Sequence, residues 1–295
     1  MEHIRAELRN LLESSDKERI SHILNEKWIG YSKAKYVMNR LDELLEHPVT
    51  HRMPNLLIIG DTNNGKTVIV NKFESKYPAK ISEEGQGVRI PVMLVQAPPV
   101  PDEKRFYNNI LDRLFVPYRI NDRVEKKEQQ VLHVLKQVKL KVLIIDEIHH
   151  ILAGSLSKQR IFLNVIKFIS NELQISLVGV GTRDAFNAIQ TDPQLSNRFE
   201  PILLTKWQMN EEYLRLLSSF QQIIPLKKPS DLTRSDVATK ILVMSDGVLG
   251  EISNILKKSA IAAIKSGEET ITKKTLDNLD WRSPSERKTL TQKLK

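Results

Sequence analysis

The residues best suited to chemistry form one continuous run, Gly60-Asp61-Thr62-Asn63-Asn64-Gly65-Lys66-Thr67. The run fits the spacing G-x-x-x-x-G-K-[ST] and directly follows the apolar residues 56–59. Its glycines let the backbone curl, so that successive N–H groups meet phosphate oxygens at a helix N-terminus. Lys66 is predicted to reach the β and γ phosphates, and Thr67 to hold Mg²⁺. We therefore predict that all eight residues bind ATP together with magnesium.

Two adjacent carboxylates, Asp146 and Glu147, follow a second apolar run at 142–145. Polar residues at the carboxyl ends of parallel strands meet at one edge of the sheet. Asp146 is therefore predicted to bind the nucleotide's Mg²⁺, and Glu147 to polarise a water for in-line attack on the γ phosphate. The pair favours hydrolysis over simple binding. The alternative is an acidic pair that only caps the next helix.

Two more residues are candidates for catalysis. Thr182 follows the apolar run 175–180 and would reach the γ phosphate or the attacking water from the same edge. Arg198 stands just before the last apolar run, and a guanidinium inserted from a neighbouring subunit would offset transition-state charge. For Arg198 the alternative is a surface or intramolecular ion pair.

The elements that position these residues follow from hydrophobic periodicity. Short apolar runs, typical of strands buried on both faces, alternate with longer stretches of helical spacing. The runs lie at 56–59, 92–95, 142–145, 175–180 and 202–204, and the helical stretches at 67–76, 103–115, 123–138 and 158–172. This alternation predicts an α/β fold, a three-layer αβα domain with a parallel sheet.

The same patterns divide the chain into four parts. We expect a helical N-terminal segment at 1–50, the P-loop domain at 51–205, a small helical lid at 206–281 and a basic tail at 282–295. Helical spacing in the lid lies at 210–222, 233–244, 249–265 and 273–279. For the tail, disorder is the default expectation and a docking peptide is the alternative.

Composition excludes several classes of protein. The 295 residues contain no cysteine, which rules out disulfides, thiolate metal sites and thiol catalysis within them. No apolar run approaches the roughly 20 residues needed to span a bilayer, and residues 1–10 are charged where a signal peptide would be apolar. These features predict a cytoplasmic protein without a membrane partner. The net charge of +9 favours a polyanionic partner.

Taken together, the motifs resemble an AAA+ ATPase of the initiator and helicase-loader type. The segments 52–67, 178–182 and 197–199 more closely resemble the TniB/TnsC family of transposition regulators, over roughly residues 20–265. The resemblance implies an ATPase that polymerises into rings or filaments around double-stranded DNA and marks a target site. Its implied partners are a transposase and a TniQ-type targeting protein. It also implies that Gln96 binds at the nucleotide site and couples its state to Glu147.

In related ring ATPases, the edge after the second strand faces a central channel. Lys104 and Arg105 lie there after a Pro-rich turn, and Arg119 begins a second basic cluster with Arg123, Lys126 and Lys127. We predict that Lys104, Arg105 and Arg119 bind DNA phosphates without reading sequence. A solvated helix face is the alternative for each cluster.

One departure from the AAA+ pattern concerns the lid. Related lids carry a sensor arginine at the start of a late helix, but residues 247–252 contain none. Three other functions stay open at this point: a helicase loader or replication initiator of the same fold, a P-loop small-molecule kinase, and a nucleotide-gated scaffold without useful turnover.

Overall fold

The computed structural model describes residues 3–81, 87–190 and 193–293. Its contacts group the chain into two compact units. The sheet unit contains residues 33–62 and 66–204, and the helical unit contains residues up to 32, 63–65 and from 205 onward. The first fifty residues are thus divided between the two units.

The centre of the sheet unit is a five-stranded parallel sheet in the order β4-β5-β6-β1-β7. The strands are β1 (Asn55–Gly60), β4 (Val92–Gln96), β5 (Val142–Asp146), β6 (Ser176–Gly181) and β7 (Phe199–Leu204). Every residue of β1, β5 and β6 is buried, which explains why these strands read as continuous apolar runs. The predicted parallel α/β sheet is confirmed.

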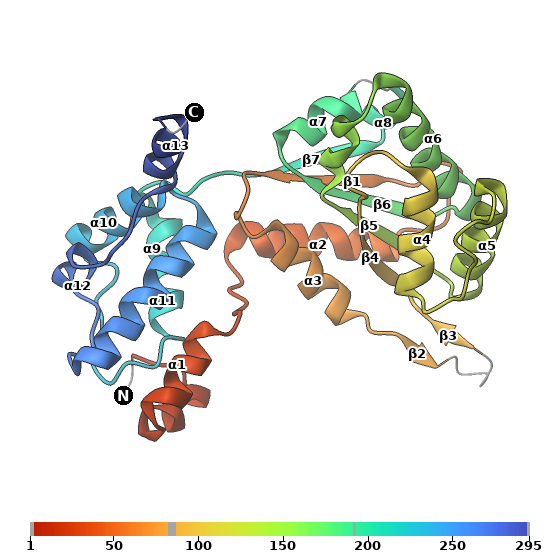
Figure 1. The fold of residues 1–295 in the computed structure, drawn as a ribbon. Coiled ribbons are helices and arrows are strands. Elements are labelled where there is room, and N and C mark those ends of the chain that lie inside the picture. Colours follow the sequence, from red (N-terminus) through yellow and green to blue (C-terminus); the bar gives the residue numbers. More distant parts are fainter. Residues whose placement is uncertain (1–2, 82–86, 191–192, 294–295) are drawn as a thin grey trace. The chain divides into compact units, whose positions relative to one another are not determined.

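Helices cover both faces of this sheet. Leu57 and Ile59 of β1 share a core with α4 (Glu103–Arg113), α5 (Val124–Gln137) and α6 (Leu156–Leu173). Side chains alternate along a strand, so Leu56 and Ile58 face the opposite layer. That layer contains α3 (Lys66–Lys76), which contacts β1, β4 and β6, and α2 (Ser32–Glu46) beside it (Figure 1). The arrangement is a three-layer αβα domain.

Several short elements were not predicted from the sequence. They are the hairpin of β2 (Lys80–Ile81) and β3 (Val88–Arg89), the 3-10 helix η2 (Ile148–Ala153), α7 (Arg183–Gln190) and α8 (Pro193–Ser196). Each is at most eight residues long, too short for hydrophobic periodicity to define.

The helical unit is built around α9 (Glu211–Gln221), α10 (Ser235–Ser245), α11 (Leu249–Ser266) and α12 (Lys273–Asp277). The N-terminal elements η1 (Ala6–Glu13) and α1 (Asp16–Leu24) belong to the same unit, because Ile23 of α1 is part of its core. The tail forms a helix, α13 (Pro284–Lys293), where disorder was the default expectation. No described helix is long and apolar enough to cross a membrane.

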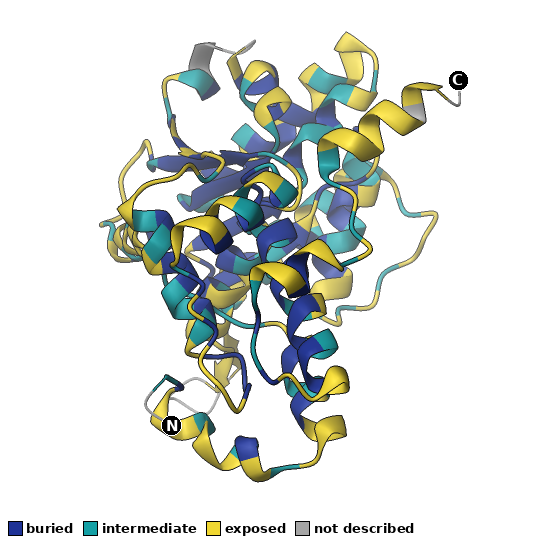
Figure 2. Cartoon of the chain, turned by 90° about the vertical axis from the view of Figure 1, so that its left-hand side faces the viewer, coloured by how far each residue is buried: buried dark blue, intermediate teal, exposed yellow. Residues whose placement is uncertain are grey.

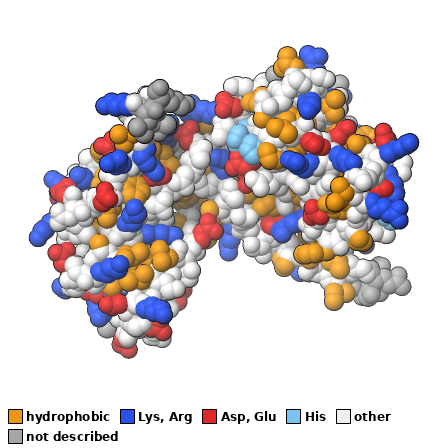
Figure 3. Space-filling model, in the orientation of Figure 1, with side chains coloured by type: hydrophobic (Ala, Val, Ile, Leu, Met, Phe, Trp, Pro, Cys, Tyr) orange, Lys and Arg blue, Asp and Glu red, His pale blue; other side chains and the backbone are white. Residues whose placement is uncertain are grey.

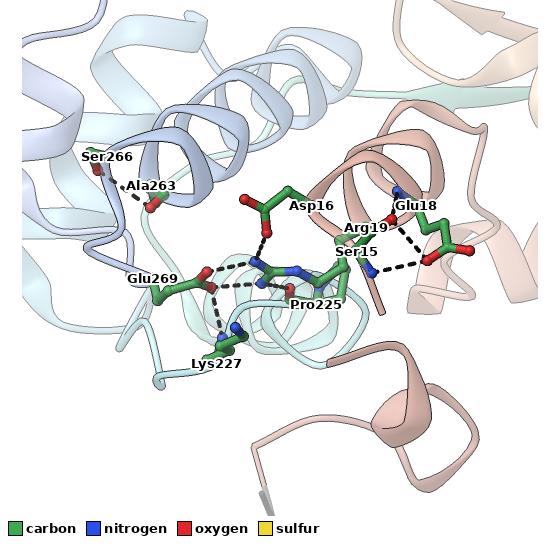
Figure 4. Close-up of polar contacts among 9 residues, drawn as sticks. All are labelled: Ser15, Asp16, Glu18, Arg19, Pro225, Lys227, Ala263, Ser266 and Glu269. Carbon is green, nitrogen blue, oxygen red and sulfur yellow. Dashed lines mark hydrogen bonds and ion pairs between the residues drawn. The ribbon is translucent and has the colours of Figure 1, made fainter. Parts of the chain in front are cut away.

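A buried ion pair fixes α1 to the helical unit. Arg19 is fully buried and donates to both oxygens of Glu269, at 2.7 and 2.6 Å, and to the carbonyl of Pro225 at 3.2 Å (Figure 4). Asp16 accepts a further hydrogen bond from the guanidinium at 2.7 Å. Hydrogen bonding from Arg19 holds the pKa of Glu269 below its ordinary value. The two charged residues are 250 positions apart in the sequence, so no local pattern predicts their contact.

Candidate functional site

The phosphate loop connects the end of β1 to the start of α3. Asn63 and Gly65 adopt positive φ angles of 61° and 81°, which curl the backbone as the motif predicts. The Lys66 ammonium donates to the carbonyls of Gly60 at 2.9 Å and Asp61 at 2.8 Å. Burial lowers the pKa of Lys66, although nearby carboxylates oppose this effect. The ammonium is therefore held at the loop by acceptors that phosphate oxygens would replace.

A hydroxyl and a carboxylate meet beside the loop, at the carboxyl end of β5. Thr67 Oγ1 donates to Asp146 Oδ2 at 2.8 Å, and Asp146 Oδ1 accepts from the Glu147 N–H at 2.8 Å. Asp146 is buried. Mg²⁺ prefers such hard oxygen ligands together with phosphate oxygens. The donor set therefore fits the predicted ion.

Glu147 stands in the left-handed region, with φ 54° and ψ 35°. For a non-glycine residue this conformation is uncommon and costs free energy of order 1 kcal/mol or more, and it recurs at functional sites. Glu147 Oε2 lies 3.2 Å from His149 Nδ1. Each of Glu147, His149 and His150 also has one side-chain atom that could ligate a metal, and these three atoms lie within 4.8 Å of one another. The Glu147 carboxylate thus contacts His149 directly after β5.

Thr182 follows β6 at the same edge of the sheet. Its preceding residue, Gly181, pairs with Ile59 of β1, one position before the phosphate loop begins. Thr182 Oγ1 is buried and has no hydrogen-bond partner among the described residues. A buried hydroxyl without a partner is costly, so this atom fits a site that is completed by a ligand.

Gln96 pairs with Asp146 in the register of β4 and β5, which brings it to the same edge. A groove of about 720 Å³ runs along this edge between β4 and α4. Its lining includes Thr67, Gln96, Asp146 and Glu147. The fold thus brings together side chains from four separate chain segments, namely Lys66, Thr67, Gln96, Asp146, Glu147 and Thr182.

Arg198 lies at the opposite end of the sheet. Its carbonyl accepts from the N–H of Asn55, the first residue of β1, whereas the phosphate loop follows Gly60 at the other end of that strand. At about 3.3 Å per residue, the strand separates the two ends by roughly 17 Å. The Arg198 guanidinium donates to Asn171 Oδ1 at 2.7 Å. Within one chain, Arg198 is therefore not brought to the phosphate loop.

The basic residues predicted to bind DNA lie around α4 and α5. Lys104 and Arg105 belong to the first turn of α4, and Arg119 is exposed in the loop before α5. Lys127 is fully buried and donates to Asn108 Oδ1 at 2.7 Å and to the Arg119 carbonyl at 3.0 Å. Burial, and secondarily the charge of Lys104, lower the pKa of Lys127. Lys and Arg side chains gather over α5 in Figure 3, but Lys127 has a structural role.

The helical unit supplies contacts to the tip of the phosphate loop that the sequence did not predict. The first turn of α11 donates from the Gly250 N–H to the Asn63 carbonyl at 2.9 Å. Asn63 Nδ2 donates to Glu251 Oε1 at 3.1 Å. A Cβ at Gly250 would lie 2.0 Å from Asn63 Oδ1, so a larger residue there would displace the Asn63 side chain. Gly250 and Glu251 could not be identified from the sequence, because their partner Asn63 lies far away in the sequence.

Comparison with known families decides the classification. A family model described as "Bacterial TniB protein" matches residues 19–209, which is more than half of the chain and includes the phosphate loop, Asp146, Glu147, Thr182 and Arg198. The chain belongs to the TniB family. The resemblance inferred from the motifs is therefore confirmed.

Solved structures support the fold of this TniB family AAA+ ATPase. The Aeropyrum pernix ORC2 protein aligns with a TM-score of 0.59 at 15% identity, covering 86% of this chain and 70% of ORC2. ORC1 of the same organism, solved in complex with DNA, aligns at 0.57 and 13% identity over 92% and 69% of the two chains. CDC6P from Pyrobaculum aerophilum aligns at 0.57 and 18% identity over 85% and 67%.

A curated protein is also similar in sequence. The ATP-binding subunit ClpE of the Clp protease of Bacillus subtilis is 24% identical over 188 residues, covering 60% of this chain. The match spans only about a quarter of ClpE, 27% of its length.

Proposed function

We propose that this protein hydrolyses ATP, assembles on double-stranded DNA in its ATP-bound form, and regulates transposition by selecting target DNA and recruiting or activating a transposase. The observation that carries the proposal is the position of Arg198. A guanidinium at the end of β1 remote from its own phosphate loop is suited to a neighbouring subunit's nucleotide. Assembly is then a requirement for catalysis.

The chemistry at the loop would use residues already in place. Lys66 exchanges the carbonyls of Gly60 and Asp61 for phosphate oxygens. Glu147 accepts a proton from the attacking water, and Thr182 Oγ1 gains a hydrogen-bond partner from the γ phosphate or that water. Thr67 and Asp146 would hold Mg²⁺, which supplies charge neutralisation at the phosphates when bound.

ATP favours assembly in this proposal because the γ phosphate is contacted from two subunits. Its own chain supplies Lys66, and the neighbouring chain supplies Arg198. Loss of the γ phosphate removes contacts at the interface and releases the subunits. Lys104, Arg105 and Arg119 would contact DNA phosphates. Such contacts do not depend on the base sequence.

Family membership supports the partners that we propose. A TniB protein is proposed to meet a transposase and a TniQ-type targeting protein in the cytoplasm, where duplex DNA is accessible. We propose that the assembled form is a ring or a helical filament. The ATP-free form would release both the DNA and these partners.

Electron microscopy with duplex DNA tests the proposal. Wild-type protein with a non-hydrolysable ATP analogue should form rings or filaments on DNA, and without nucleotide it should not. Arg198→Ala should bind ATP within about twofold of wild type but lose hydrolysis by roughly 10³-fold, because only the neighbour's site is affected. Arg215→Ala, which removes an exposed arginine of α9, is the control. Monomers in every sample, with Arg198→Ala fully active, would contradict the proposal.

One alternative is favoured by a specific observation. The A. pernix ORC and P. aerophilum CDC6P structures share this fold, so an initiator or helicase loader is the second candidate. Stimulation of a purified transposase by the ATP-bound protein on DNA would support transposition. Loading of a replicative helicase without any effect on transposase would support the alternative. A small-molecule kinase would need an acceptor pocket with its own base, which the motif set does not suggest.

A further inference from the structure

The C-terminal helix α13 is attached to the helical unit by polar contacts. Ser285 donates from its N–H and its hydroxyl to Asp246 Oδ2, at 2.7 and 2.6 Å. Trp281, just before the helix, donates from Nε1 to the Met244 carbonyl at 2.9 Å. No residue of α13 whose side chain is described is buried, and Figure 2 shows the helix next to the C-terminus mostly yellow. Without a buried apolar face, α13 depends on these contacts for its position.

α13 brings one positive charge to the first turn of α11. The guanidinium of Arg287 donates to Glu251 Oε2 at 2.5 Å, and the Arg287 side chain is half exposed. Glu251 is buried, with 8% of its surface exposed. Its second oxygen, Oε1, accepts from the side-chain amide of Asn63 in the phosphate loop. One carboxylate therefore joins the tail helix to the loop.

The charge of Glu251 is unfavourable for the function of that loop. A triphosphate bound at the loop would bring negative charge close to a buried carboxylate, where repulsion is weakly screened. Arg287 neutralises the carboxylate and lets Oε1 keep its hydrogen bond to Asn63. Removal of the partner from a buried ion pair leaves an uncompensated charge, which is more costly than the absence of both charges.

We propose that Arg287 is a positioning residue for nucleotide binding: from the C-terminal helix, it neutralises Glu251 and thereby maintains the phosphate-loop contact at Asn63. The inference rests on the proposed ATP site at this loop. It also assigns a function to the basic tail. ATP affinity depends on whether α13 is docked, although α13 itself lies more than 200 residues from the loop in sequence.

A double-mutant cycle with a fluorescent ATP analogue tests this coupling. Arg287→Ala should bind the analogue roughly tenfold more weakly, because an unpaired carboxylate next to the loop repels the triphosphate. Glu251→Gln keeps an acceptor for Asn63 and removes the charge, so it should bind at least as tightly as wild type. The double variant should bind within about twofold of Glu251→Gln, because no charge is left to neutralise.

Lys288→Ala is the matched control, since it removes the same charge from the next residue of α13. Asp246→Gly is a second route to the same state. It removes the anchor of Ser285 at a position whose φ of 50° suits glycine, and leaves Arg287 and Glu251 intact. It should weaken binding as Arg287→Ala does, and it decides the question alone if Arg287→Ala does not fold by circular dichroism.

Wild-type affinity in Arg287→Ala and Asp246→Gly, or a double variant as weak as Arg287→Ala, would overturn the inference. Failure of the proposed ATP site gives a different result. In that case the wild-type protein would not bind the analogue, or Lys66→Ala would bind it as wild type does.

Discussion

At the scale of single residues, the site combines a strained backbone conformation with a buried hydroxyl that lacks a hydrogen-bond partner among the described residues. Glu147 occupies the left-handed region and contacts His149, while the Thr182 hydroxyl is buried without a partner among the described residues. Such features cost stability in the absence of ligand. They are expected where binding of a ligand restores the missing contacts.

The first prediction at this scale concerns Glu147. Glu147→Gln keeps the size of the side chain but cannot accept a proton, so ATP hydrolysis should fall by at least about 100-fold. ATP binding should change by less than about twofold. Phosphate release and nucleotide titration measure the two effects. His149→Ala, which removes the neighbour of Glu147 but keeps the proposed catalytic base, should reduce hydrolysis far less. Equal turnover in Glu147→Gln and wild type would exclude Glu147 as the base.

The second prediction concerns Lys66, a buried cation whose pKa is lowered by burial. Lys66→Met removes this desolvated charge, so the melting temperature without nucleotide should not fall. ATP at 100 times its Kd should stabilise the wild type by about 2.7 kcal/mol, and this gain should vanish in the variant. Thermal unfolding with and without ATP measures both. Lys72→Met, an exposed position in the same helix, should retain the gain.

At the scale of elements, long-range charged contacts connect the ends of the chain to the helical unit. Arg19 of α1 pairs with Glu269 beyond the end of α11, and Arg287 of α13 pairs with Glu251 at its beginning. Glu269 adopts a φ of 56°, which directs its carboxylate to Arg19 and lets its N–H donate to the Ala263 carbonyl at 3.0 Å. Both ends of α11 are therefore fixed by distant segments.

The buried pair predicts a dependence of stability on pH. Hydrogen bonding from Arg19 lowers the pKa of Glu269 in the folded state relative to the unfolded value of 4.5. A lowered acid pKa stabilises the fold above the unfolded value, and this contribution is lost as the pH falls through the folded one. The melting temperature should therefore decrease when the pH is lowered below about 4.5.

Glu269→Gln should remove most of this acid-dependent loss and lower stability near pH 7 by about 3 kcal/mol, because Arg19 stays buried without its counter-charge. Thermal unfolding between pH 3 and 7 measures both effects. Glu268→Gln, an adjacent and exposed carboxylate, is the control and should behave as wild type. If Glu269→Gln lost as much stability at low pH as wild type does, Glu269 would not be the group responsible.

At the scale of the whole molecule, the proposed function depends on contacts between copies and with DNA. Lys104 and Arg105 lie at the first turn of α4, whereas Lys127 is fully buried. The charge available to a polyanion at this edge is therefore smaller than the count of basic residues indicates. This makes the contribution of each remaining cation measurable.

Exchange of Lys104 and Arg105 for Glu should abolish ATP-dependent DNA binding at 150 mM salt. If residual binding is measurable at low salt, the slope of log K against log salt should fall by about two, one for each lost phosphate contact. Lys136→Glu with Lys139→Glu makes the same charge change at the other end of α5 and should have a smaller effect. Unchanged affinity and slope in the first variant would exclude this edge as the DNA contact.

Local sequence patterns were enough to predict the five strands of the parallel sheet, the phosphate loop and the polar residues that follow these strands. Lys66, Thr67, Asp146 and Thr182 were predicted to share one edge, and in the structure they do. The reason is that a buried parallel strand has a local hydrophobic pattern, and parallel strands bring their carboxyl ends together. Their catalytic and binding roles stay predictions.

Which distant side chains meet could be learned only from the folded chain. It positioned Arg198 against Asn171, buried Lys127, divided the first fifty residues, and joined Asn63 to Glu251 and Arg287. Periodicity reports which face of an element is buried but not which partner a charged residue finds. The stabilisation of a charge depends on its distance to a partner and on burial, and both are properties of the folded chain.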